Sequence, residues 1–463
     1  MELIISFFCF SFFICEFHSE SFLLKLSEIT LKLKGTGNIT ILSDDFFKRY
    51  EHFEVYKNNL FVNLEQNKYS VSQNEEENEI IIKILWNITI LSTKNMFEGC
   101  TKIIEIDLSK FDTSQVNDME YMFHNCISLT SINLSNLMTS KVTNMKGMFS
   151  DCCSLKNLSL SNFDTLNVED MSFLFNNCTK LTSLDLSNFN TSKVKNMGYI
   201  FRFCKKLSYL NISNFNTSLV VDMSYMFSNC IILETFYIYK FNTSQVTNMA
   251  YMFYNCQNLD LSILSNFNTS KVTKMNQMFY YCSKLNTTFL SNFDTSRVTE
   301  MNYMFNKCSF TEFNLPNFNT SSVKKMNDMF KNCFSLTSIN VSNFITSNVD
   351  DMNMMFYGCS SLTSLDLSNF NTSKVTNISG IFSKCSELKV LDLSNLNIAK
   401  IKDYKNIFNE CNKLEYINLN LLDNNIYSFA NNIDSLISQN LIVCSENYNE
   451  TDLYLYILIY NIH

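Results

Sequence analysis

Residues 359–384 read CSSLTSLDLSNFNTSKVTNISGIFSK, and close copies of this stretch follow one another along most of the chain. Aligned on their cysteine, the copies repeat every 26 residues, with one spacing of 25 between Cys308 and Cys333. A fixed period of this length is typical of a solenoid, in which each copy forms one layer. The cysteines that mark the copies are Cys100, Cys126, Cys152, Cys178, Cys204, Cys230, Cys256, Cys282, Cys308, Cys333, Cys359, Cys385 and Cys411.

The two halves of each copy have different periodicities. Residues 362–368 alternate in their second half and precede an Asn-Phe-Asn-Thr-Ser turn, which predicts a short strand. Residues 220–230 space their apolar side chains by three and four, which predicts a short helix, and Asp222 is suited to cap it. We therefore predict an α/β solenoid, a leucine-rich-repeat-like array of about 13 strand-turn-short helix units with a parallel sheet on one face.

One copy alone buries too few apolar side chains to offset the conformational entropy lost when it folds, so copies must stack and the array must be capped. The regular pattern begins near Met96 and fades after about residue 421. We predict a signal peptide at 1–19, an N-terminal cap at 20–95, the solenoid at 96–420 and a C-terminal cap at 421–463.

The chain begins with an apolar run, residues 3–14, that suits a secretory signal and is too short to span a bilayer. No other window reaches the roughly 18 apolar residues of a membrane helix. We therefore expect a secreted or cell-surface protein without a transmembrane span. The alternatives are a lipid anchor on Cys15, although Phe13 and Ile14 before it are the wrong sizes for that signal, and an intracellular location if residues 3–14 are not a signal.

The repeated side chains fit roles in packing. Equivalent Cβ atoms in stacked strands are about 4.7–4.9 Å apart, which is further than the roughly 3.5–4.5 Å that a disulfide prefers. Metal binding is disfavoured because successive cysteines are a whole copy apart and His124 is the only histidine inside the array. We expect buried free thiols, with disulfides as the main alternative. The Met and Phe columns should fill the core, and Thr and Ser hydroxyls should satisfy N–H groups of the turns.

Composition argues against several classes of protein. The net charge of -8 and the pI near 5.2 disfavour nucleic-acid binding, which needs clustered Lys and Arg. The chain has 4 His, no Gly-rich phosphate loop and no Ser-His-Asp spacing. We predict no enzymatic activity, no cofactor and no metal site.

The Leu181, Leu184 and Leu186 spacing is similar to the leucine-rich repeat. More specifically, CTKLTSLDLSNFNTSKVKNMGYIF, residues 178–201, and the quoted stretch resemble the BspA-like leucine-rich repeat surface proteins of bacteria and some protists. The resemblance implies a secreted or surface-held protein without catalytic residues that adheres to host or neighbouring-cell surface or matrix proteins. The chain shows no evident anchor of the kind that such attachment would need.

A candidate partner surface lies where the repeat changes character. In the leucine-rich pattern, the residue seven positions after each Cys faces solvent, and this column becomes apolar in the middle of the array. An exposed apolar and aromatic patch predicts a protein partner. The alternative is a one-residue register slip that turns Leu261 and Ile263 inward. The candidate contact residues are Tyr237, Tyr239, Leu261, Ile263 and Phe289. An intracellular interaction scaffold is the alternative function.

Overall fold

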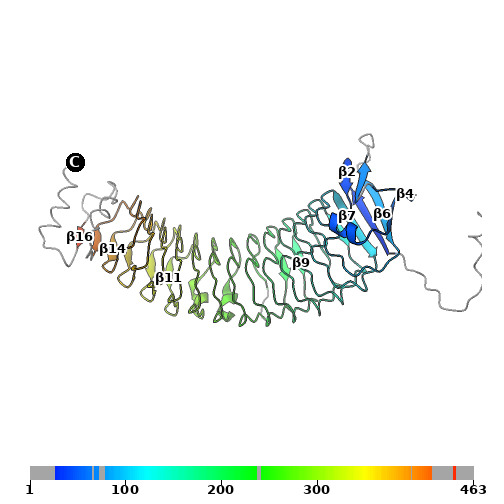
Figure 1. Cartoon of the computed structure of the whole chain (residues 1–463). Helices are drawn as coiled ribbons and strands as arrows, with labels where there is room; N and C mark the ends of the chain where they lie inside the picture. The colour runs from blue at the N-terminus through cyan, green and yellow to red at the C-terminus, as the bar shows by residue number, and fades with distance from the viewer. Residues whose placement is uncertain are drawn as a thin grey trace, which may run out of the picture.

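The computed structural model describes residues 27–64, 67–71, 79–236, 241–397, 399–419 and 442–444. The chain forms an arc of stacked rungs, one rung for each copy of the repeat, with a sheet and a short helix at the N-terminal end (Figure 1). The solenoid prediction is therefore confirmed. The predicted signal peptide and nearly all of the predicted C-terminal cap lie outside the described residues, so the domain boundaries stay predictions.

The N-terminal end is closed by a six-stranded sheet with the order β4-β3-β6-β1-β7-β8. Its first five strands pair antiparallel, whereas β7 pairs parallel with β8 and so joins the sheet to the rungs. A separate antiparallel ribbon pairs β2 with β5. The strands are β1 (Ser27–Leu33), β2 (Gly37–Thr40), β3 (Phe53–Lys57), β4 (Leu60–Phe61), β5 (Lys68–Val71), β6 (Ile80–Trp86), β7 (Ile103–Lys110) and β8 (Ser131–Asn133).

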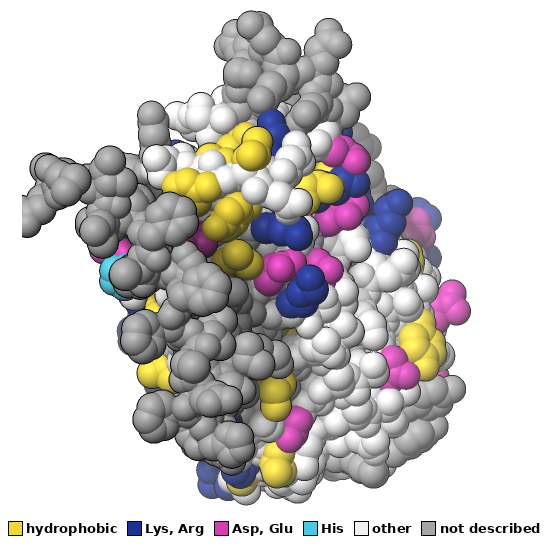
Figure 2. Space-filling view, turned by 90° about the vertical axis from the view of Figure 1, so that its right-hand side faces the viewer, with side chains coloured by type: hydrophobic (Ala, Val, Ile, Leu, Met, Phe, Trp, Pro, Cys, Tyr) yellow, Lys and Arg dark blue, Asp and Glu magenta, His cyan; other side chains and the backbone are white. Residues whose placement is uncertain are grey.

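The outer face of this sheet carries ion pairs. Lys32 Nζ lies 2.6 Å from a carboxylate oxygen of Glu79 and 3.4 Å from one of Glu105. Lys110 pairs with Glu28 at 3.2 Å. Figure 2, which views the molecule from this end, shows the basic and acidic side chains next to one another. The opposite face of β1 is apolar and buried, so the sheet separates the core of the solenoid from solvent.

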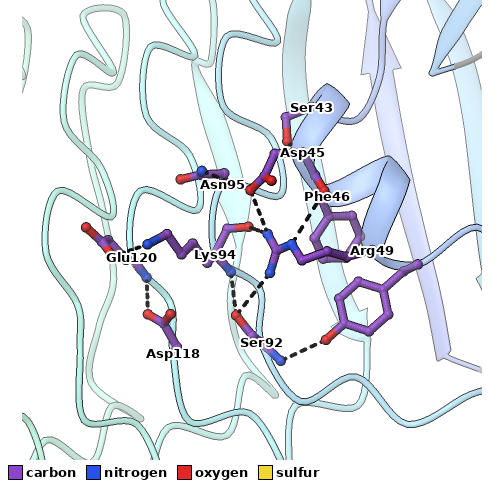
Figure 3. A network of polar contacts seen from close by, with 10 residues as sticks. Ser43, Asp45, Phe46, Arg49, Ser92, Lys94, Asn95, Asp118 and Glu120 are labelled. Atoms are coloured by element: carbon purple, nitrogen blue, oxygen red, sulfur yellow. Dashed lines mark hydrogen bonds and ion pairs between the residues drawn. The ribbon is translucent and has the colours of Figure 1, made fainter.

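Helix α1 (Asp44–Arg49) fixes this cap to the first rung. Phe46 on α1 is fully buried in the core. From the last turn of α1, the Arg49 guanidinium donates hydrogen bonds to the carbonyl oxygen of Lys94 and to the hydroxyl of Ser92 (Figure 3). Both acceptors belong to the first rung, so the cap and the solenoid share polar contacts as well as a core.

The first half of most rungs forms the predicted strand. The strands are short, parallel and in register, so that Leu184 is opposite Leu210 and Leu365 is opposite Leu391. The strands form several separate sheets: the rung of Cys152 has no strand, and in the middle of the array two 3-10 helices, η1 (Ser262–Asn266) and η2 (Thr287–Leu290), replace strands. The remaining strands are β9 (Ser183–Asp185), β10 (Tyr209–Asn211), β11 (Glu312–Asn314), β12 (Ser338–Asn340), β13 (Ser364–Asp366), β14 (Val390–Leu393), β15 (Tyr416–Leu419) and β16 (Ile442–Cys444).

The second half of each rung is not a helix, and the predicted α/β class is wrong in this respect. In each copy, the fifth residue before the next cysteine and the residue directly before it have left-handed backbone angles. Before Cys230 these residues are Tyr225 (φ 56°) and Asn229 (φ 61°). The N–H groups of Met223, Tyr225, Phe227 and Asn229 donate to carbonyls of the next rung at 2.7–3.0 Å, whereas a helix would use carbonyls four residues back. The chain is a β-solenoid.

The error has a physical origin. Tight turns that repeat every four residues return side chains to the same side of the chain, as a helix does, so the apolar spacing alone does not separate the two. Asp222, the predicted helix cap, instead accepts a hydrogen bond from the Ser224 N–H at 2.7 Å and closes a turn. The residue at this position also forms a parallel bridge to its equivalent in the next rung, from Ser92 through to Asp403. This seam runs without interruption past η1 and η2.

The core consists of columns of identical residues. Phe rings of successive rungs stack at centroid distances of 5.4–6.1 Å, from Phe97 to Phe408. The thirteen column cysteines are buried and unpaired, which confirms that expectation. From Cys126 on, each thiol donates to the carbonyl oxygen of the Phe that stands three residues before the preceding column cysteine. Cys230 Sγ, for example, lies 3.2 Å from the carbonyl oxygen of Phe201.

A column of threonines joins the turns between rungs. Thr217 is fully buried, and its hydroxyl donates to the carbonyl oxygen of Asn242 in the next rung at 3.0 Å. The same hydroxyl accepts a hydrogen bond from the Asn242 N–H at 2.8 Å. The hydroxyl therefore satisfies a turn N–H, as the sequence predicted, and that turn belongs to the neighbouring rung.

We predict that Thr217→Val destabilises the protein by about 1–3 kcal/mol, because valine keeps the shape but leaves the two backbone groups of Asn242 without a partner. Urea unfolding followed by circular dichroism measures this change. Ser218→Ala is the control, since the Ser218 N–H and not its hydroxyl makes the local hydrogen bond, and it should change stability by less than about 0.5 kcal/mol. Equal stability of Thr217→Val and the native chain would contradict the role of the hydroxyl.

Candidate binding surface

The strands present a solvent-facing surface along the arc. In β13, Ser364 and Asp366 are exposed, and Leu365 between them is buried. The same alternation occurs in β9 and β11. Because successive side chains of a strand point to opposite sides, the exposed strand residues form two neighbouring columns at the surface, and in most rungs they are the fifth and seventh residues after the cysteine. We call these columns the strand face.

Towards both ends of the arc, the strand face carries ladders of polar side chains. Asn133 Nδ2 donates to the Asp107 carboxylate at 2.9 Å, and Asn418 Nδ2 donates to the Asp392 carboxylate at 3.0 Å. Hydrogen bonds from the Ser187 side chain and N–H lower the pKa of the Asp185 carboxyl below its ordinary value, so it stays charged at neutral pH. The side chains of these ladders are polar, and hydrogen bonds to the adjacent rung hold them in place.

The middle of the strand face has a different character, and it includes the residues predicted to contact a partner. Ile263 on η1 and Phe289 on η2 are partly buried and pack against the edge of the core. The two 3-10 helices lie in adjacent rungs and contact each other. Leu261 is fully buried, so it belongs to the core and is not accessible to a partner. Tyr237 and Tyr239 lie outside the described residues.

The local sequence explains why the strand is lost here. The sixth residue after the cysteine is an apolar, buried side chain in most rungs, but it is Ser262 in one copy and Thr288 in the next. Burying an unpaired hydroxyl is costly. The 3-10 turns expose Ser262 and Thr288 and place Leu261 in the core. Leu261 therefore points inward, as the register-slip alternative predicted, but it does so through a 3-10 turn and not through a shifted strand.

A second surface, which the sequence analysis did not identify, is a ladder of aromatic rings at the fifth position before the cysteine. Phe173, Tyr199, Tyr225 and Tyr251 stack with centroid distances of 4.2–4.4 Å and are half-buried. Burial raises the pKa of the Tyr225 hydroxyl, which keeps it protonated. A Tyr at the same position in three successive copies is the sequence signal that could have identified this ladder.

The Arg202 guanidinium lies beside this ladder. Its central carbon is 5.5 Å from the ring centre of Tyr199 and 5.2 Å from that of Tyr225. It is also 4.4 Å from the ring centre of Phe203. At these distances a guanidinium is attracted by the negative faces of the rings. The position of Arg202 is therefore set by side chains of two rungs.

Within the described part of the chain, no three His, Cys, Asp or Glu side chains are grouped so that they could hold a metal ion. Over the same residues, no helix has both the length and the apolar character that crossing a bilayer requires.

The chain matches a known protein family over most of its length. A model described as "Mycoplasma protein of unknown function, DUF285" matches residues 68–184, 171–265, 258–339 and 335–440. These overlapping matches together cover well over half of the chain and include the whole strand face from β9 to β15. No curated protein matches the chain.

Proposed function

The chain belongs to the DUF285 family of repeat proteins, and on that premise we propose that it binds other proteins and catalyses no reaction. The observation that carries this proposal is the composition of the strand face. Ile263 and Phe289 form a partly exposed apolar centre, and ladders of Asn and Asp lie towards both ends. An apolar centre with a polar periphery is the usual composition of a protein-protein interface.

We further propose that the binding is adhesion at the cell surface or after secretion. The support is the resemblance of residues 178–201 and 359–384 to BspA-like surface proteins, together with the apolar run at residues 3–14. The partner would be a surface or matrix protein of a host or of a neighbouring cell.

An intracellular scaffold with the same strand face is the second candidate. The thirteen unpaired column thiols favour it, because oxidising compartments promote disulfides and reducing ones keep thiols free. Mass spectrometry of the mature N-terminus separates the two candidates, since secretion removes residues 3–14 and an intracellular protein keeps them.

The binding proposal predicts that the double variant Ile263→Ser, Phe289→Ser loses its partner. We expect about tenfold weaker binding or more, because two interface anchors typically contribute over 1 kcal/mol each. The measurement is quantitative capture of surface and matrix proteins by the immobilised chain, with partners identified by crosslinking and mass spectrometry.

The matched control is Phe334→Ser with Ile345→Ser, which removes the same two residue types from exposed positions away from the strand face. It should capture the same proteins as the native chain. Thermal unfolding of both double variants tests whether each still folds. Undiminished capture by the folded Ile263, Phe289 variant would refute the proposed site.

A further inference from the structure

Five basic residues gather on three consecutive rungs. They are Lys156, Lys180, Arg202, Lys205 and Lys206, which we call the basic patch. The four lysines are exposed, and none of the five forms an ion pair with any residue that the structure describes. Near the cap, Lys32, Lys94 and Lys110 pair with carboxylates, and the chain as a whole has a net charge of -8. The basic patch is therefore a local reversal of charge.

The stacking of the rungs brings these residues together. Lys180 and Lys206 occupy the same position in successive copies, directly before the paired strands β9 and β10, so their backbones are about 4.8 Å apart. The Lys156 carbonyl oxygen accepts a hydrogen bond from the Thr182 N–H at 3.2 Å, which places Lys156 on the adjoining rung. Tyr209, at the start of β10, is 52% exposed beside them.

Phe203, next to Arg202, stands directly before the cysteine, where the turn of every copy has a left-handed backbone. Its φ of 59° is left-handed, and the same position holds Asn177 one copy earlier and Asn229 one copy later. Asn adopts this conformation readily, whereas a bulky residue there is an outlier. Phe203 is only half-buried, so packing in the core does not offset the strain. Tyr281 and Lys307 adopt the same conformation at this position in later copies, so the conformation belongs to the fold, and what is particular to Phe203 is its ring.

The ring of Phe203 holds the cations of the patch. The Arg202 guanidinium carbon lies 4.4 Å from the ring centre and Lys205 Nζ lies 5.5 Å from it. In addition, Arg202 Nε is buried and has no hydrogen-bond partner. Arg202 and Lys205 are thus ordered around an aromatic ring, and no described carboxylate pairs with either, as expected for a surface that receives an acidic ligand.

We propose that the basic patch binds a short acidic segment of the protein partner, with carboxylates on the lysines and an apolar side chain against Phe203 and Tyr209. The inference rests on the proposed protein-binding function and adds the chemistry of one contact. A short segment fits better than a long polyanion, because acidic residues border the patch: Asp151 lies before it, and Glu234 and Asp260 lie on the rungs after it. A nucleic acid or sulfated glycan would extend onto these carboxylates and be repelled.

The first test is fluorescence anisotropy with the full chain and a short labelled peptide of alternating Glu and Phe. The triple variant Lys180→Ala, Lys205→Ala, Lys206→Ala should bind this peptide about tenfold more weakly, and binding to the native chain should weaken as salt rises. The control triple Lys271→Ala, Lys284→Ala, Lys374→Ala makes the same change in net charge at exposed positions on other rungs and should keep the affinity. Equal losses in both triples would overturn the proposal, because net charge alone would then explain binding.

The second test replaces Phe203 with the residue common at its position. Phe203→Asn should leave the melting temperature unchanged or raise it, because it relieves the left-handed strain, and it should weaken peptide binding. A lower melting temperature with unchanged peptide binding would assign Phe203 a purely structural role and overturn this part of the proposal.

The competing ligands and the proposed function are tested separately. Tighter binding of a heparin fragment or a single-stranded oligonucleotide than of the acidic peptide would overturn the choice of a short acidic segment. If the Lys180, Lys205, Lys206 variant captures the native partner as well as the native chain does, while the Ile263, Phe289 variant loses it, the patch inference fails and the proposed function stands.

Discussion

In reducing buffer, the folded solenoid is expected to unfold as the pH rises from about 9 to about 11. Burial raises the pKa of all thirteen column thiols, and it raises those of Cys126 and Cys256 to about 12. The column thiols are buried, and from the second rung on they donate to Phe carbonyls, so ionisation would leave a buried charge.

Stability falls as the pH rises because the thiols ionise at different pH values in the folded and the unfolded chain. In the unfolded chain the thiols ionise near their ordinary pKa of about 8.5–9, whereas in the folded chain they stay protonated. The stabilisation is therefore complete below about pH 8 and is lost as the pH rises towards the folded pKa. Between pH 9 and pH 10, each thiol lowers the free energy of unfolding by about 1 kcal/mol. The column together lowers it by on the order of 10 kcal/mol, which is comparable to the whole stability of a typical domain.

Circular dichroism as a function of pH, with a phosphine reductant present, measures the transition. Potentiometric titration should show close to one proton released per column thiol when the chain unfolds at pH 10. Cys153→Ala is the control, because Cys153 lies outside the column and is only half-buried, and it should leave the alkaline midpoint almost unchanged. A constant spectrum up to pH 11 would mean that the thiol column does not limit stability.

Phe227→Ala is expected to lower the free energy of unfolding by about 3–5 kcal/mol. Phe227 is fully buried, and its ring stacks between those of Phe201 and Phe253 at 5.7 and 5.8 Å. Truncation leaves a cavity in the middle of the Phe column. Because each rung contacts only its neighbours, more distant rungs cannot move in to fill the space.

Guanidinium unfolding followed by circular dichroism measures this loss. Phe334→Ala removes the same side chain from a position that is 56% exposed and should cost less than about 0.5 kcal/mol. In a linear array, weakening one central rung should also broaden the transition, because the two ends then unfold more independently. A cost below about 1 kcal/mol for Phe227→Ala would show that the stacked rings do not stabilise the central rungs.

The period and the core of this protein could be predicted from sequence because both depend on residue type at a fixed interval. Met223, Phe227 and Cys230 recur every 26 residues and can only be buried together when copies stack. The helix could not be ruled out from apolar spacing, but another signal was present. Asn177, Asn229 and their equivalents stand directly before the cysteine in many copies, and Asn is a residue that favours left-handed turns over helices.

The candidate surfaces were less predictable. Ser262 and Thr288 marked a departure from the repeat in the sequence. The change of backbone from strand to 3-10 turn could not be predicted, because it depends on whether Leu261 fits into the core of its own rung. The basic patch depends on contacts between rungs. Arg202 is one cation among many in the sequence, and its place over the rings of Tyr199 and Phe203 follows only from the stacked structure.

The seam bonds also bear on how such a chain changes over generations. Nearly every hydrogen bond of the seam joins a residue to one in the adjacent copy, and duplication of a whole copy supplies both partners of each new bond. Gene recombination can therefore lengthen or shorten the arc in steps of about 4.8 Å and leave the remaining interior untouched, provided that the end pieces are kept. The reach of the molecule is set by copy number, and the identity of its partner is set by the few positions at which copies differ.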